Sequence, residues 1–156
     1  MESPTVVIIP GSFAPAKLYR GFAQSLERHG IDSHIVDVPS VGRQGILPQQ
    51  SMSDDVDEII RVVSKLLGQG KEVVFMAHSY GGIPTTQSLS KLSRKAQEAQ
   101  GKQGGISRVI YLASVLLQTG VSNLDGFESN LPDYLTIKVI VYITRLEKLR
   151  LTRLIG

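Results

Sequence analysis

The 156-residue sequence contains no cysteine, and this absence removes three kinds of chemistry. It excludes a disulfide framework, a thiol nucleophile and a cysteine-ligated metal site. The sequence also lacks any run of about 18 uninterrupted apolar residues, so it predicts no membrane span. Its first residues, MESPTVVIIPG, lack the basic segment and the long apolar segment of a signal peptide, so we expect a cytoplasmic protein.

Excess positive charge is confined to the C-terminal tail. Residues 1–137 hold 12 Lys and Arg against 13 Asp and Glu, whereas residues 138–156 hold five against one. Because the body has no basic patch with interleaved aromatic residues, we expect no nucleic-acid partner and no membrane partner. The composition, 42% hydrophobic and 20% charged, is typical of one globular domain. The sequence leaves the oligomeric state open.

Metal and nucleotide motifs are missing as well. The three histidines, His29, His34 and His78, stand apart without the spacing of metal ligands. The segment PGSFAPAK (10–17) fits neither G-x-G-x-x-G nor G-x-x-x-x-G-K-[ST], so a nucleotide-binding domain ranks last among the functions considered. We therefore predict no metal and no cofactor.

Strand-like apolar runs alternate with amphipathic, helix-like segments over the first 114 residues. The predicted strands are 5–10, 33–39, 72–78 and 107–114; the predicted helices are 16–29, 53–67 and 80–96; polar loops cover 40–50 and 97–105. This alternation favours an α/β fold in which a mainly parallel sheet lies between two helical layers, a three-layer α/β/α sandwich.

The predicted helix over 53–67 carries an acidic first turn. Ser51 or Ser53 can cap its N-terminus. The acids in or near this turn are Asp54, Asp55, Asp57 and Glu58. Backbone N–H groups at a helix N-terminus favour negative charge, so we interpret these acids as structural rather than catalytic.

Ser79 stands between a predicted strand and a predicted helix, in the stretch EVVFMAHSYGGIP (72–84). A nucleophile elbow has this order, and its strained turn needs small residues two positions before and after the serine. Ala77 and Gly81 occupy those positions. The alternative is an ordinary helix-capping serine. We expect the His78 side chain to point away from Ser79 and to serve packing.

The segment IIPGSFAP (8–15) ends the first predicted strand and fits the loop that completes an oxyanion hole. Gly11 allows a tight turn there. The backbone N–H groups of Ser12 and Tyr80 are the predicted donors, and the alternative is a plain Pro-Gly turn at a strand end.

These stretches, together with LYRGFAQSLERHGIDSHIVDVPSVG, DDVDEIIRVV and GGISRVIYLAS, resemble the α/β-hydrolase superfamily over residues 5–135. More narrowly, the sequence is similar to fungal hydrolases related to plant methyl-ester esterases. The resemblance implies a partial α/β-hydrolase fold with the strands in the spatial order second, first, third, fourth. It also implies a serine hydrolase acting on a small ester or related acyl substrate, with Ser79 as nucleophile and Ser12 and Tyr80 at the oxyanion hole.

No histidine follows Ser79 in the sequence, although the triad of this fold runs serine, acid, histidine along the chain. His29 and His34 precede the serine and are not expected to act as the base. Asp125 and Asp133 are interpreted as surface or lid residues. A catalytically inactive binding protein of the same family is therefore the alternative function.

The tail departs from the family pattern after about Lys138, where the charge balance also changes. We divide the chain into a partial hydrolase domain over 1–135 and a divergent basic tail over 136–156. Within the tail, 136–143 could form a strand and 144–156 a basic helix. Our hypothesis is that the chain is a C-terminally truncated product.

Overall fold

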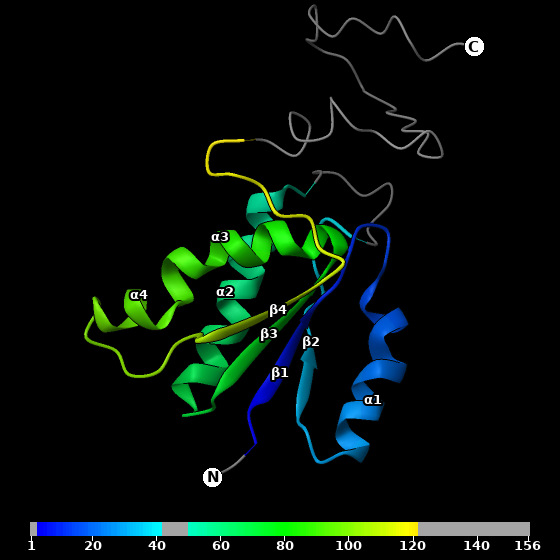
Figure 1. Ribbon diagram of the computed structural model, residues 1–156, viewed down its shortest axis with the longest axis horizontal. Coiled ribbons are helices and arrows are strands. Elements are labelled where there is room, and N and C mark those ends of the chain that lie inside the picture. The colour runs from blue at the N-terminus through cyan, green and yellow to red at the C-terminus, as the bar shows by residue number, and fades with distance from the viewer. Residues whose placement is uncertain (1–2, 42–49, 122–156) are drawn as a thin grey trace, which may run out of the picture. The chain divides into compact units, whose positions relative to one another are not determined.

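The computed structural model describes residues 3–41 and 50–121 (Figure 1). Its elements follow in the order β1 (Thr5–Ile9), the 3-10 helix η1 (Ala16–Tyr19), α1 (Arg20–Arg28), β2 (Ser33–Ile35), α2 (Met52–Gly68), β3 (Val73–His78), the 3-10 helix η2 (Ser79–Gly81), α3 (Gly82–Leu92), α4 (Arg94–Glu98) and β4 (Arg108–Leu112). The predicted alternation of strands and helices is confirmed.

The four strands form one parallel sheet in the order β2-β1-β3-β4, which is the order that the resemblance implied. The register places Val7 of β1 beside both His34 and Phe75, and Met76 of β3 beside Ile110. Because all strands run in one direction, their carboxyl ends share one edge of the sheet, and Ser79 follows β3 at that edge.

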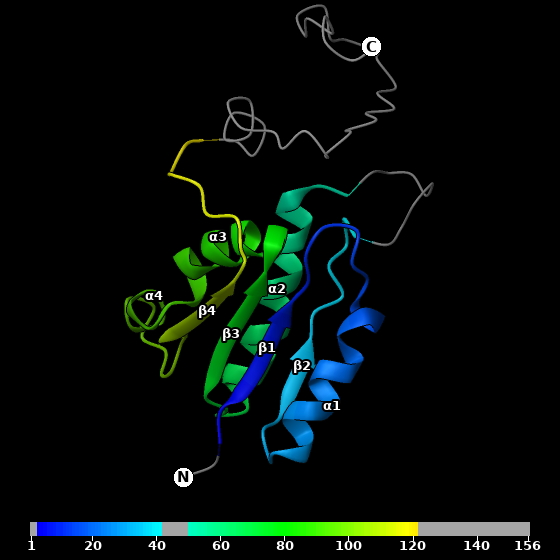
Figure 2. The same cartoon turned by 45° about the vertical axis from the view of Figure 1, so that its right-hand side comes forward.

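Alternate residues of the central strands face opposite helical layers. Val7, Ile9, Phe75 and Ala77 belong to a core cluster that also contains residues of α2 and α3. Ile8 and Met76 pack instead with Ala23 of α1. Figure 2 shows α1 on one side of the sheet and α2 and α3 on the other. The predicted α/β/α arrangement with a parallel sheet is thus confirmed.

The second strand is shorter than the predicted 33–39. β2 ends at Ile35, and beyond it only the Val36 N–H continues the pairing, by donating to the carbonyl oxygen of Ile8 at 2.9 Å. The chain then turns, with the Val41 N–H donating to the carbonyl oxygen of Val38 at 3.0 Å. Pro39 lies inside this turn and has no N–H to extend a ladder.

The predicted single helix over 80–96 is wrong in one respect, because it breaks at Ser93. Ser93 is extended (φ −59°, ψ 152°), and its side chain accepts a hydrogen bond from the Ala96 N–H, which caps α4. The backbone on both sides of the break pairs with Ile106, which accepts from Arg94 at 3.1 Å and donates to Leu92 at 2.8 Å. Pairing with the segment before β4 replaces the helical bonds lost at Ser93.

Ser51, not Ser53, caps α2. Its side chain accepts from the Asp54 N–H while the Asp54 carboxylate accepts from the Ser51 N–H, which is a reciprocal capping box. Asp54 therefore has the structural role expected of the acidic first turn. Asp55 differs, because its side chain is fully buried.

The face of β4 that shares a side with α1 stays partly uncovered. Ile110 and Leu112 of β4 are 53% and 52% exposed. The chain separates into two compact units, Met1–Thr119 and Gly120–Gly156, and the structure describes only residues 120–121 of the second. Asp125, Asp133, the predicted boundary at 135/136 and the elements expected over 136–156 lie outside the described residues. In the described ranges, no helix is long and apolar enough to cross a bilayer.

Candidate active site

Ser79 follows the last residue of β3 directly and adopts the left-handed conformation, with φ 53°. A side chain at positive φ places Cβ too close to the following carbonyl oxygen, which costs on the order of 1–2 kcal/mol. The strand before Ser79 and the helices η2 and α3 after it complete a strand–turn–helix unit. This is the strained geometry of a nucleophile elbow and differs from an ordinary N-cap, which has extended backbone angles.

Two glycines after Ser79 are required by close backbone contacts. A Cβ on Gly81 would lie 2.6 Å from the carbonyl oxygen of Pro10, at the end of β1. A Cβ on Gly82 would lie 2.5 Å from the carbonyl oxygen of Val115. Backbone atoms on either side of the elbow therefore leave no room for larger residues.

The segment after β4 holds the elbow through two hydrogen bonds. The Val115 N–H donates to the carbonyl oxygen of Ser79 at 2.9 Å, and the Ser114 hydroxyl donates to the carbonyl oxygen of Ala77 at 2.7 Å. Ala77 itself, the small residue two positions before the serine, is fully buried. The strained backbone is thus tied on both sides of Ser79.

The loop after β1 lies against the serine. A Cβ on Gly11 would stand 2.9 Å from the Cβ of Ser79, so the loop approaches as closely as a glycine permits. The Gly11 N–H donates to the Tyr19 hydroxyl at 2.9 Å. Ser12 is exposed, and within the described part of the chain nothing accepts a hydrogen bond from its N–H.

His78 serves this packing. Its Nδ1 lies 2.7 Å from the Tyr19 hydroxyl, and the two rings meet edge to face with centroids 5.9 Å apart. Because the Tyr19 oxygen already accepts from Gly11, its proton can point to Nδ1, and the neutral ring then carries its proton on Nε2. Over residues 3–41 and 50–121, no hydrogen bond joins His78 to the Ser79 side chain.

Tyr80 and Asp55 form a contact that the sequence analysis missed. The Tyr80 hydroxyl donates to Asp55 Oδ2 at 2.7 Å. The same carboxylate accepts from the Ser40 N–H at 2.8 Å and from the Ser40 hydroxyl at 2.6 Å. Burial raises the pKa of the Tyr80 hydroxyl well above its ordinary value, and the hydrogen bond to Asp55 raises it further. One signal was available, because Asp55 lies four residues before Ile59 on the buried stripe of α2.

The remaining histidines lie away from the elbow. The His29 ring bonds the carbonyl oxygen of Ser25 at the end of α1. His34 lies on β2 with its side chain largely exposed. Partial desolvation of the ring lowers its pKa, and the positive charge of the nearby Arg61 lowers it further. Among the described residues, no side chain hydrogen-bonds the Ser79 hydroxyl, and no three His, Asp or Glu gather in a way that could hold a metal ion.

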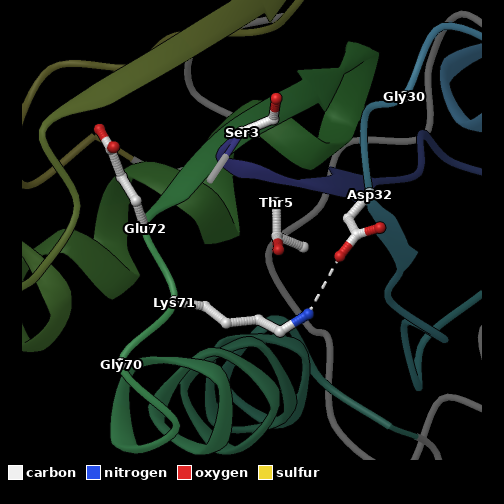
Figure 3. Close-up of a pocket in the computed structure, with 7 residues that line it drawn as sticks. All are labelled: Ser3, Thr5, Gly30, Asp32, Gly70, Lys71 and Glu72. Carbon is white, nitrogen blue, oxygen red and sulfur yellow. Dashed lines mark hydrogen bonds and ion pairs between the residues drawn. The ribbon is translucent and has the colours of Figure 1, made fainter. Parts of the chain in front are cut away.

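Figure 3 shows a hollow at the opposite edge of the sheet, where β1 and β3 begin. Its lining residues are Ser3, Thr5, Gly30, Asp32, Gly70, Lys71 and Glu72. Lys71 and Asp32 form an ion pair across it at 3.1 Å, with both side chains at least 38% exposed. Such exposed pairs contribute about 0–1 kcal/mol, and the hollow is not at the strand ends where Ser79 lies.

Known proteins are similar to this chain in sequence. The profile of the "Alpha/beta hydrolase family" matches residues 6–150. "Probable hydrolase R7" of Phoma sp. is 37% identical over 126 residues, which cover 81% of this chain and 48% of that protein. "Alpha/beta hydrolase nvfD" of Aspergillus novofumigatus is 28% identical over 132 residues, covering 85% of this chain and 51% of that protein.

A solved structure shares the fold. A mutant of polyneuridine aldehyde esterase superimposes with a TM-score of 0.61 at 16% identity, over 84% of this chain and 49% of that one. The chain spans about half the length of the curated relatives it matches. The family profile covers nearly the whole sequence, and the parallel sheet and elbow agree with it. The chain therefore belongs to the alpha/beta hydrolase family.

Proposed function

We propose that this chain carries the nucleophile and oxyanion hole of a serine hydrolase that acts on a small ester or related acyl substrate. Ser79 is the proposed nucleophile. The backbone N–H groups of Ser12 and Tyr80 are the proposed oxyanion donors. The observation that carries the proposal is the left-handed Ser79 at the carboxyl end of β3, with Gly11 packed against it.

The proposed reaction has two stages, formation of an acyl-enzyme and its hydrolysis. Ser79 Oγ attacks the acyl carbon and a tetrahedral oxyanion forms. The hydroxyl proton passes to a solvent base, because no side chain of the described residues bonds the hydroxyl. The bond to the leaving alcohol then breaks, and the alcohol departs with a proton. Water hydrolyses the resulting acyl-enzyme and releases the carboxylic acid and free Ser79.

The oxyanion donors fit this reaction. Tyr80 lies in the first turn of η2, where backbone N–H groups have no acceptor within the helix. The Ser12 N–H has no acceptor in the described ranges, and its loop is in van der Waals contact with Ser79 at Gly11. Donors that are fixed before the reaction stabilise developing charge without reorganisation, and losing one costs about 10²–10³ in kcat in a well-studied protease.

An apolar substrate also fits the surroundings of the loop. Phe13, the residue after Ser12, is 89% exposed, and Leu18 of η1 is 65% exposed. Exposed apolar side chains next to an oxyanion loop can cover the acyl group or the alcohol of a substrate. A small hydrophobic ester is therefore the preferred substrate class.

A fluorophosphonate probe tests the proposal on the chain itself. Ser79 Oγ would displace fluoride from phosphorus, and intact mass would report the adduct. We expect slow labelling, because loss of triad partners leaves only about 10³–10⁴-fold catalysis over water in serine proteases. Ser79→Ala should abolish the adduct. Ser12→Ala should keep it, since the proposed donor of Ser12 is its backbone N–H. A folded, monomeric sample without an adduct at Ser79 would overturn the proposal.

A second function is favoured by one observation, which is that none of the three histidines hydrogen-bonds Ser79 in the described residues. A binding protein of the same family would bind an apolar ester beside Ser79 without hydrolysing it. Saturable binding of a p-nitrophenyl ester without release of p-nitrophenol would support this function over the first.

A further inference from the structure

We propose that Asp55 is a positioning residue for Tyr80, the residue that supplies one proposed oxyanion donor. The inference depends on the proposed function for its catalytic consequence. Its structural basis is independent: a buried carboxylate on α2 ties the side chain of the residue next to Ser79 to the segment that follows β2.

Among residues 3–41 and 50–121, every hydrogen bond of the Asp55 carboxylate leads out of its own helix. Oδ1 accepts from the Ser40 N–H at 2.8 Å, and Oδ2 accepts from the Ser40 and Tyr80 hydroxyls at 2.6 and 2.7 Å. The side chain has no exposed surface, so these donors replace its lost hydration. Hydrogen bonds to a charged acceptor are shorter and about twice as strong as neutral ones.

A purely helix-stabilising role does not explain this arrangement. The capping box of α2 is already complete with Ser51 and Asp54. The backbone N–H of Asp55 bonds the carbonyl oxygen of Ser51, which leaves the Asp55 carboxylate free to turn toward the sheet. Asp54 therefore caps the helix, and Asp55 connects the helix to the residue after Ser79.

The connection bears on the proposed oxyanion donor through Tyr80. The Tyr80 hydroxyl is fixed at one end by Asp55, and its backbone follows the strained Ser79 at the other. Two rotatable side-chain bonds separate the fixed ring from the backbone, so the tether restricts how η2 can tilt. Misplacement of a catalytic group by about 1 Å can cost 10²-fold in rate, so a tether of this kind can affect reactivity without touching substrate.

The test compares Asp55→Asn and Tyr80→Phe with Asp54→Asn, which weakens the neighbouring cap but does not touch Tyr80. For each variant, fluorophosphonate labelling of Ser79 gives a maximal rate and a half-saturating probe concentration, and thermal unfolding gives the melting temperature. We expect Asp55→Asn and Tyr80→Phe to lower the maximal rate about tenfold without changing half-saturation. Asp54→Asn should lower only the melting temperature. The double variant Asp55→Asn/Tyr80→Phe should be no slower than the slower single variant, because both remove one contact.

A second readout does not depend on catalysis. In ¹H–¹⁵N spectra, the Gly82 amide, which donates to the carbonyl oxygens of Ser79 and Tyr80 in η2, should exchange with solvent at least tenfold faster in Asp55→Asn and Tyr80→Phe, and Asp54→Asn should leave its exchange unchanged. If the probe does not label the wild-type protein, the proposed function is overturned. Amide exchange alone then tests whether the hydrogen bond between Asp55 and Tyr80 holds η2 in place. If Asp55→Asn does not fold, Tyr80→Phe decides it, since that change removes one hydroxyl. Unchanged labelling and unchanged amide exchange in a folded variant would overturn the inference.

Discussion

Gly11 and Ser79 follow strands that are far apart in the sequence, yet a Cβ atom on Gly11 would stand 2.9 Å from the Cβ atom of Ser79. Real Cβ atoms do not approach so closely, so the two loops are in contact only because residue 11 is a glycine. Ser12 is the next residue of the same loop. Four predictions follow from this contact and from the groups around it.

Gly11→Ala should separate the two loops. The added methyl also meets Nδ1 and the carbonyl oxygen of His78, at 3.2 and 3.3 Å, so we expect a loss of about 1–3 kcal/mol in the free energy of unfolding. Urea unfolding measures that loss, and fluorophosphonate labelling should slow in parallel. The control is Gly21→Ala in α1, where nothing lies within 4 Å and the change should stabilise the helix by roughly 0.5–1 kcal/mol. Equal unfolding midpoints for the two variants would contradict the contact.

Ser79→Gly should make the protein more stable while it removes the proposed nucleophile. Glycine adopts φ 53° without the penalty paid by a side chain, so we expect a gain of about 1 kcal/mol, less the backbone entropy of glycine in the unfolded chain. Ser79→Ala is the matched control, since it removes the hydroxyl and keeps the strain. Urea midpoints of the two variants measure the difference. An alanine variant more stable than the glycine variant by the roughly 0.5–1 kcal/mol that glycine costs in backbone entropy would show that the turn stores no strain.

Tyr19→Phe should loosen the loop after β1, which contains Gly11 and Ser12. Without the hydroxyl, the buried Gly11 N–H and Nδ1 of His78 both lose their hydrogen-bond partner. Leaving such groups unpaired costs about 1–3 kcal/mol, which chemical unfolding would measure. Tyr111→Phe is the control, because its hydroxyl bonds Thr86 at an exposed position. We expect little change in the free energy of unfolding of Tyr111→Phe. If Tyr19→Phe loses no more than this control, the Tyr19 hydroxyl does not hold Gly11 and His78 together.

The raised pKa of Tyr80 predicts a loss of stability in alkaline solution. The unfolded chain releases the tyrosine proton near pH 10, whereas the folded protein retains it to higher pH. The stabilising contribution is therefore complete below pH 10 and declines as the pH rises from 10 toward the folded-state pKa. Urea midpoints between pH 8 and 11 should fall more steeply for wild type than for Tyr80→Phe. Parallel curves would mean that Tyr80 titrates alike in both states.

The position of the elbow could be predicted from sequence because its determinants are local. Strand 73–78, the serine and the small residues at 77 and 81 are consecutive, and the apolar runs on either side identify a strand and a helix by their periods. The same kind of local pattern predicts a serine cap for α2, but it fits Ser51 and Ser53 equally, and only the contact with Asp54 distinguishes them. The proposed roles of Ser79, Ser12 and Tyr80 remain predictions.

Tertiary structure decided what depends on residues distant in the chain. The helix breaks at Ser93 because the backbone there pairs with Ile106. Gly81 and Gly82 must be small because the carbonyl oxygens of Pro10 and Val115 lie against them. The buried Asp55 carboxylate accepts hydrogen bonds from Ser40 and Tyr80. Asp54 and Asp55 look alike in the sequence, because both are acids in the first turn of a helix. One caps the helix and the other lies inside the protein. The helical period places Asp55 on the buried stripe of α2, but only the tertiary structure brings Ser40 and Tyr80 to its carboxylate.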